Sequence, residues 1–167
     1  MIEVVKNIIR FFILLLLQIV VLNNIDISVF LSPMIIVLFV ILLPFNTPKW
    51  ILLISTFLMG IILDLFMNTP GIVSFALVFL AYSRPVILRL LRPREGYVIG
   101  AIPGVKDLGW NWFFQYSLIM TSFFHFLYFM ILGISQENFL FIIWKTIISS
   151  LFTLLVIYLF QLFSIKK

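Results

Sequence analysis

The sequence predicts an all-α integral membrane protein that forms a single bundle of six transmembrane helices. Of its 167 residues, 64% are hydrophobic and 10% are charged, and the mean hydropathy is +1.28. A soluble domain carries about 25% charged and 45–50% apolar residues. No polar stretch is long enough to build a second core, so residues 1–167 are expected to form one domain.

Apolar runs separated by polar residues, prolines or glycines define the six spans. Most approach the roughly 20 residues that cross a bilayer. The second run is shorter and lies between Pro33 and Pro44, so a buried or re-entrant segment is its alternative. No small-residue cleavage site follows the first run, which predicts a retained helix. The spans are Val5–Leu22, Phe30–Leu43, Trp50–Met67, Ile72–Leu91, Trp112–Leu132 and Phe139–Phe163.

The charge distribution predicts that both termini are cytoplasmic. With the N-terminus inside, ten of the 11 Lys and Arg residues fall at or near the inner side, and Lys145 is the exception. The outer loops then carry Asp26 and Glu137. This bias follows the positive-inside rule. The Arg92–Asn111 loop is cytoplasmic in this topology, and its four glycines and two prolines argue against a continuous helix.

One carboxylate, Asp64, lies within the third span. A charge inside hydrocarbon costs on the order of 2.5–3.5 kcal/mol even on lenient scales, so it usually faces protein, a polar cavity or a partner. Thr56, Gly60 and Asp64 follow one another at helical-turn spacing and share a face. Gly60 would allow another helix to approach closely.

Four polar side chains from four spans fall in the outer half of the bilayer: Gln18, Asp64, His125 and Lys145. Pairing with Asp64 would explain why Lys145 departs from the positive-inside rule. Such a pair is structural or a partner contact in one interpretation and part of a substrate or proton pathway in another. In a third, the two residues do not interact and Lys145 extends outward.

Hydroxyl residues form stripes on the last two spans. Ser117 and Thr121 share a face with His125, and Ser149 and Thr153 share one with Lys145. Their simpler interpretation is hydrogen bonding to their own helix backbone.

The inner side carries several arginines. Arg84 precedes Pro85 in the fourth span, where it either extends to the membrane surface beside a proline kink or makes a contact. Arg89, Arg92 and Arg94 form a cytoplasmic cluster, which predicts a lipid-headgroup anchor or a docking patch for protein.

Several function classes find no support in the residues. The chain has no cysteine and one histidine, which excludes thiolate chemistry and a multi-histidine metal site. The six acidic residues are scattered, and no hydrolase, metalloprotease or phosphate-loop motif occurs. The basic residues form no groove interleaved with exposed aromatics. We therefore expect no enzyme activity, no cofactor and no nucleic-acid partner.

Taken in order along nearly the whole chain, several motifs resemble the family of the rod shape-determining membrane protein MreD. The Arg92–Tyr97 and Lys106–Gly109 segments and His125 resemble one branch of it. The other matching segments are Phe11–Gln18, Gly60–Phe66 with Pro70-Gly71, and Tyr82–Pro85.

The resemblance implies a non-catalytic component of the bacterial inner membrane that acts in cell elongation and peptidoglycan synthesis. It implies association with a bitopic periplasmic MreC-like protein and, through it, with MreB, RodA and a penicillin-binding transpeptidase. It also implies a six-helix architecture similar to the substrate-binding subunits of energy-coupling-factor vitamin transporters.

That similarity supplies the alternative function, a small-molecule transporter subunit. Such subunits typically carry alanines at four-residue spacing on the first helix and polar groups on long outer loops. The first span here has no alanine and the outer loops are short, so both observations favour the scaffold.

Overall fold

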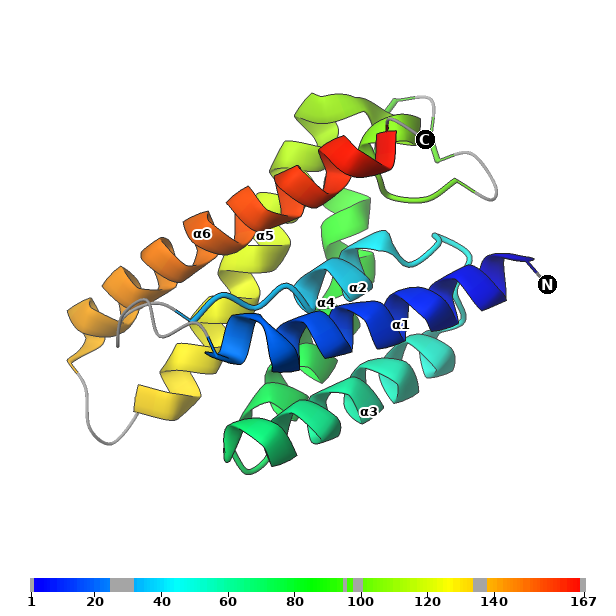
Figure 1. Ribbon diagram of the computed structural model, residues 1–167. Coiled ribbons are helices and arrows are strands. Elements are labelled where there is room, and N and C mark those ends of the chain that lie inside the picture. Colours follow the sequence, from blue (N-terminus) through cyan, green and yellow to red (C-terminus); the bar gives the residue numbers. More distant parts are fainter. Residues whose placement is uncertain (1, 25–31, 95, 98–100, 134–137, 166–167) are drawn as a thin grey trace.

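The computed structural model describes residues 2–24, 32–94, 96–97, 101–133 and 138–165, and all of its regular elements are helical. Figure 1 labels the main helices. In chain order they are α1 (Ile2–Val20), the 3₁₀ turn η1 (Leu22–Asn24), α2 (Val37–Leu42), α3 (Lys49–Met67), α4 (Ile72–Leu90), α5 (Val105–Gly133) and α6 (Phe139–Ile165).

The long helices from α3 to α6 pack against their neighbours in the sequence as antiparallel pairs (Figure 1). Helix α3 packs against α4, α4 against α5, and α5 against α6, while α1 contacts α2 and α3. In Figure 1 the starts of α1 and α3 and the end of α6 lie toward one side of the bundle. We call this side the terminal end of the bundle.

Within the described residues, four helices are long and apolar enough to cross a membrane: α3, α4, α5 and the Phe139–Leu162 part of α6. The chain is therefore an α-helical, multi-pass membrane protein. Helix α1, which corresponds to the first predicted span, is not one of those four: it has 19 residues but carries three charged ones, Glu3, Lys6 and Arg10, in its first half.

Of the second transmembrane helix predicted over Phe30–Leu43, Phe30 and Leu31 lie outside the described residues, and over the remaining residues the prediction is wrong. Helix α2 has six residues and is about 9 Å long. Residues Ser32–Ile36 precede it without α-helical structure, and Met34–Leu43 are all buried. Pro33 explains the extended start, because proline lacks a backbone N–H and restricts the residue before it. The buried segment that the sequence left as an alternative is what the structure contains.

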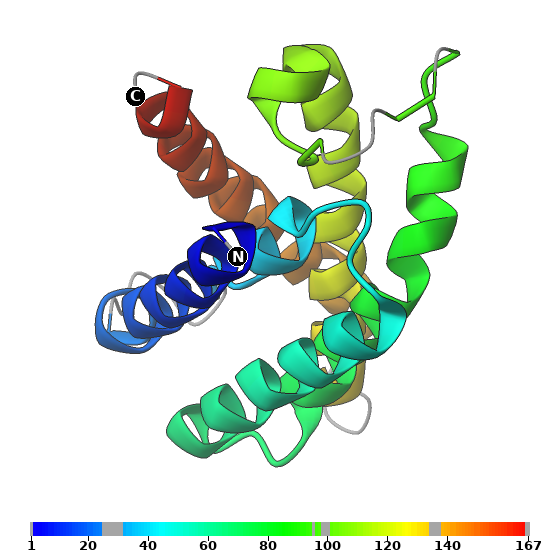
Figure 2. The same ribbon diagram turned by 90° about the vertical axis from the view of Figure 1, so that its right-hand side faces the viewer.

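This buried segment lies at the centre of the bundle. In Figure 1 it runs back alongside α1, and in Figure 2 α2 is surrounded by the longer helices. It contacts α1, α4 and α5. Its backbone outside α2 lacks the hydrogen bonds that a regular helix supplies. Such backbone is tolerated at membrane depth when other parts of the protein form hydrogen bonds with its N–H and C=O groups.

Helix α5 begins earlier than the predicted Trp112. A first turn starts at Val105, and the helix is interrupted at Gly109, whose φ of 78° and ψ of 168° are not helical. Positive φ at this point favours glycine. The interruption turns the chain from the loop into the long part of α5.

Candidate functional site: three buried polar joints

Asp64 forms the first joint, at the turn between α3 and α4. Its Oδ1 accepts hydrogen bonds from the Thr69 hydroxyl at 2.8 Å and the Val73 N–H at 2.9 Å. Its Oδ2 accepts from the Ser74 N–H at 2.9 Å and from the Ser74 hydroxyl. The side chain is 8% exposed. Because Gly71 provides no side-chain cap for α4, Asp64 fills that role from the preceding helix.

Gly60 lies one turn before Asp64, where α3 and α4 touch. A Cβ on Gly60 would lie 2.4 Å from Ser74 Cα, so the helices approach at backbone distance. Thr56, one turn further back, is buried and donates to the Leu52 carbonyl of its own helix at 2.8 Å. The predicted face of α3 is thus the face that packs on α4.

The proposed pairing of Asp64 with Lys145 is wrong. All four hydrogen bonds to Asp64 come from the α3–α4 connection and the first turn of α4. Helix α3 packs on α4, whereas α6 packs on α5. Lys145 is 6% exposed, and its Nζ lies 4.8 Å from the centroid of the Phe141 ring on the same helix. Equal depth in the membrane did not make the two helices neighbours.

The second joint holds the extended start of the buried segment, and Gln18 of α1 is its first member. Gln18 is buried, and its Nε2 donates to the Pro33 carbonyl at 3.0 Å and to Asn23 Oδ1 at 2.9 Å. Its Oε1 accepts from the Ile35 N–H at 2.9 Å. One amide therefore satisfies both a carbonyl and an N–H of the non-helical backbone.

Side chains from α5 and α6 complete this joint from the other side. Ser149 Oγ accepts the Ser32 N–H at 3.2 Å, and Thr153 Oγ1 accepts the Met34 N–H at 3.1 Å. His125 Nδ1 lies 2.8 Å from the Thr121 carbonyl, so Nδ1 carries the proton. Its Nε2 lies 3.3 Å from both the Thr153 hydroxyl and the Ser32 carbonyl. The structure thus brings Gln18 and His125 together around the segment, without Asp64 or Lys145.

The third joint holds the other end of the buried segment with two arginines. Arg10 Nη1 donates to the Leu42 carbonyl at 2.9 Å, and Arg84 Nη2 donates to the Leu43 carbonyl. Arg84 Nε also donates to the Tyr116 hydroxyl at 3.1 Å. Cations are favourable at helix C-termini, where carbonyls lack intrahelical partners. Arg84 is buried, so the interpretation that it extends to the membrane surface is wrong.

Aromatic residues cover this third joint. Phe45 stacks on Tyr97 with ring centroids 4.2 Å apart, and Trp112 lies against Tyr116 at 4.9 Å. Trp112 Nε1 donates to the carbonyl of Leu91, just after α4, and the Tyr97 hydroxyl donates to the carbonyl of Leu88 in its last turn, each at 2.8 Å. Burial raises the pKa of Tyr97, so its hydroxyl remains a donor.

The other predicted arginines remain at the surface. Arg89, Arg92 and Arg94 are exposed at the end of α4 and just after it. Their positions leave them accessible to headgroups or to another protein. Arg84 does not belong to this cluster, because it points into the bundle.

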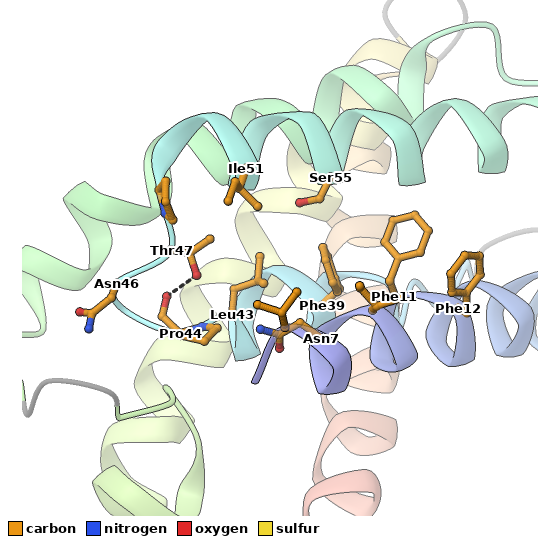
Figure 3. A pocket seen from close by; sticks show the side chains of 13 residues that line it. Asn7, Phe11, Phe12, Phe39, Leu43, Pro44, Asn46, Thr47, Ile51 and Ser55 are labelled. Atoms are coloured by element: carbon orange, nitrogen blue, oxygen red, sulfur yellow. Dashed lines mark hydrogen bonds between the residues drawn. The ribbon is translucent and has the colours of Figure 1, made fainter. Parts of the chain in front are cut away.

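An apolar groove of about 450 Å³ lies between α1 and α3. Figure 3 shows Phe11, Phe12 and Phe39 along one side and Ile51 on the other, with Asn46 and Thr47 toward one end. Within the described residues, no group of three or more His, Cys, Asp or Glu side chains could hold a metal ion.

Sequence reasoning missed the roles of Arg10, Tyr116 and Asn23. Arg10 is one of the ten basic residues expected at or near the inner side, although its position inside the first apolar run indicates that it can turn inward. The aromatic residues gave no signal, because hydroxyl-bearing rings are common in membrane helices.

The fold and these joints define a multi-pass helical membrane protein whose buried polar groups bind its own backbone. No protein family model, curated protein or solved structure matches the chain.

Proposed function

We propose that the chain is a non-catalytic inner-membrane scaffold component of the bacterial cell-elongation machinery, which synthesises peptidoglycan and maintains rod shape. The observation that carries this proposal is how the motif residues are used. Gln18, Asp64, Arg84 and His125 hydrogen-bond to backbone groups at three separate joints. Residues used in this way specify a shape rather than a reaction centre.

The partners in this proposal are membrane lipids and a bitopic MreC-like periplasmic protein, which links the scaffold to MreB, RodA and a penicillin-binding transpeptidase. A scaffold needs a rigid framework with accessible surfaces. Helices α1 and α3, which border the groove, expose large apolar side chains, Phe12, Phe57 and Leu58 among them. Arg92 and Arg94 add an exposed basic patch at the terminal end of the bundle.

Unbiased copurification from a rod-shaped bacterium tests the proposal. We expect the tagged chain to recover an MreC-like protein. Recovery of an ATPase transport module instead would identify the alternative, a transporter subunit. Replacing Arg92 and Arg94 with Glu should lower partner recovery or membrane assembly, whereas Lys49→Glu, another exposed basic residue at that end, serves as the matched control.

The proposed topology places both termini and the 92–111 loop in the cytoplasm. Because the chain lacks cysteine, single cysteines can report each side. Cysteines at Asn24, Asn68 and Gln136 should react with a membrane-impermeant thiol reagent in intact cells, and one at Gly100 should not. Labelling at Gly100 would overturn this topology.

A further inference from the structure

A small cavity with charged and polar residues in its lining lies where the end of α2 meets α1, the start of α5 and the last turns of α6. Its volume is about 140 Å³, which is room for several water molecules. It is distinct from the apolar groove between α1 and α3. Its lining residues are Arg10, Leu42, Ile102, Gly104, Lys106, Asp107 and Gln161.

Gln161 is the unusual member of this lining. It is 5% exposed, yet its side-chain amide makes no hydrogen bond to any described residue. Among the described residues, the enclosed side-chain polar atoms without a partner do not include those of Gln161, so its amide opens on the cavity. An amide in this position is available to donate a hydrogen bond to a bound polar group.

The charges around the cavity select the chemistry of that group. Arg10 and Lys106 contribute two positive charges and Asp107 one negative charge, which leaves the lining with a net charge of +1. The Asp107 carboxylate is engaged locally, because its Oδ2 accepts the Ile102 N–H at 2.8 Å. Arginine and lysine beside an amide donor form a typical environment for phosphate oxygens.

We propose that this cavity binds a phosphate group, with Gln161 donating a hydrogen bond to it and Arg10 and Lys106 supplying the charge. The phosphate belongs either to a phospholipid headgroup or to a small soluble phosphate. The proposal is independent of the scaffold function, because it rests on the lining of the cavity.

Native mass spectrometry and thermal unfolding of the full chain in detergent test the proposal, with phosphatidylglycerol and inorganic phosphate as separate probes. We expect at least one probe to bind and to raise the unfolding temperature. Binding of phosphatidylglycerol alone identifies a lipid headgroup site. Competition of inorganic phosphate with the lipid identifies a site for soluble phosphate as well. If neither probe binds, the proposal is wrong.

Variants connect binding to the cavity. Gln161→Leu should lower affinity roughly tenfold, as expected for loss of a hydrogen bond to a charged group. It should not lower the stability of the ligand-free chain, because Gln161 has no partner to lose. Gln115→Leu is the matched control, since Gln115 is exposed on α5 and lies outside the cavity. Equal affinities for these two variants would overturn the assignment.

Variants that change the charge of the cavity should affect phosphate binding in opposite directions. Lys106→Gln should weaken binding, while Lys49→Gln, at an exposed position outside the cavity, should not. Asp107→Asn should strengthen binding by about threefold, because it removes a negative charge while keeping an acceptor for the Ile102 N–H. Weaker binding by Asp107→Asn would show that the cavity does not select an anion.

Discussion

The α3–α4 hairpin and the buried segment differ in how far along the sequence their backbone groups find hydrogen-bond partners. Both contain backbone groups that need partners inside the protein. In the hairpin, the Asp64 carboxylate accepts hydrogen bonds from the N–H groups of Val73 and Ser74, which are nine and ten residues away. The buried segment depends on distant helices, because Arg84 reaches Leu43 across 41 residues and Thr153 reaches Met34 across 119. Substitutions in the hairpin should therefore destabilise only the α3–α4 connection, whereas substitutions that affect the buried segment should destabilise several helices.

The largest effect is expected from Arg84→Leu. This change leaves the Leu43 carbonyl and the Tyr116 hydroxyl without their partner in a buried setting, and it should cost about 3 kcal/mol of unfolding free energy. Denaturant titration in detergent measures the loss. Hydrogen exchange should increase in α2, α4 and α5 together. Arg89→Leu, at an exposed position on α4, should change stability by less than about 0.5 kcal/mol.

Asp64→Leu should cost about 2–3 kcal/mol, because it leaves two N–H groups and two hydroxyls without their acceptor. Asp64→Asn should lose less, since one side-chain oxygen still accepts. Faster hydrogen exchange should be confined to the α3–α4 connection. Exchange that spreads through α5 and α6 would break the distinction between the two regions.

The same variant tests whether Asp64 and Lys145 are independent. Because the two residues do not pair, the losses of Asp64→Leu and Lys145→Leu should add in the double variant to within about 0.5 kcal/mol. Recovery of stability in the double variant would show that the residues interact after all.

Gly60→Ala should cost about 1–3 kcal/mol, which is typical of an added methyl group in a packed interior. Its Cβ would meet the Ser74 backbone at 2.4 Å, and backbone cannot move aside as a side chain can. Gly104→Ala is the control, because the nearest atom to its Cβ is a Leu42 methyl at 3.8 Å. Equal stabilities of the two variants would mean that α3 and α4 separate without cost.

The contrast between the regions also explains what the sequence could predict. The apolar runs predicted α3, α4, α5 and α6, and helical spacing predicted that Thr56, Gly60 and Asp64 share one face. Both features depend only on residues that are close together in the sequence. The partners of Gln18 and Arg84 depend on which helices surround residues 32–43. A single sequence carries no direct information on that arrangement. Pro33 and Pro44 indicated that the second run was unusual, and they gave no information on which side chains would hold it.

The smallest effect concerns Thr121, whose buried hydroxyl finds no hydrogen-bond partner among the described residues. Thr121→Val keeps the shape of the side chain and removes an unsatisfied polar group, so stability should stay unchanged or rise by up to about 1 kcal/mol. The Thr121 carbonyl still accepts from His125, because that contact belongs to the backbone. Thr153→Val is the matched control. It should destabilise by about 1–3 kcal/mol, since it leaves the Met34 N–H without an acceptor. Thermal unfolding of the two variants in detergent compares them directly. A loss for Thr121→Val as large as that for Thr153→Val would show that the Thr121 hydroxyl has a partner in the folded protein, and it would extend the second joint by one residue.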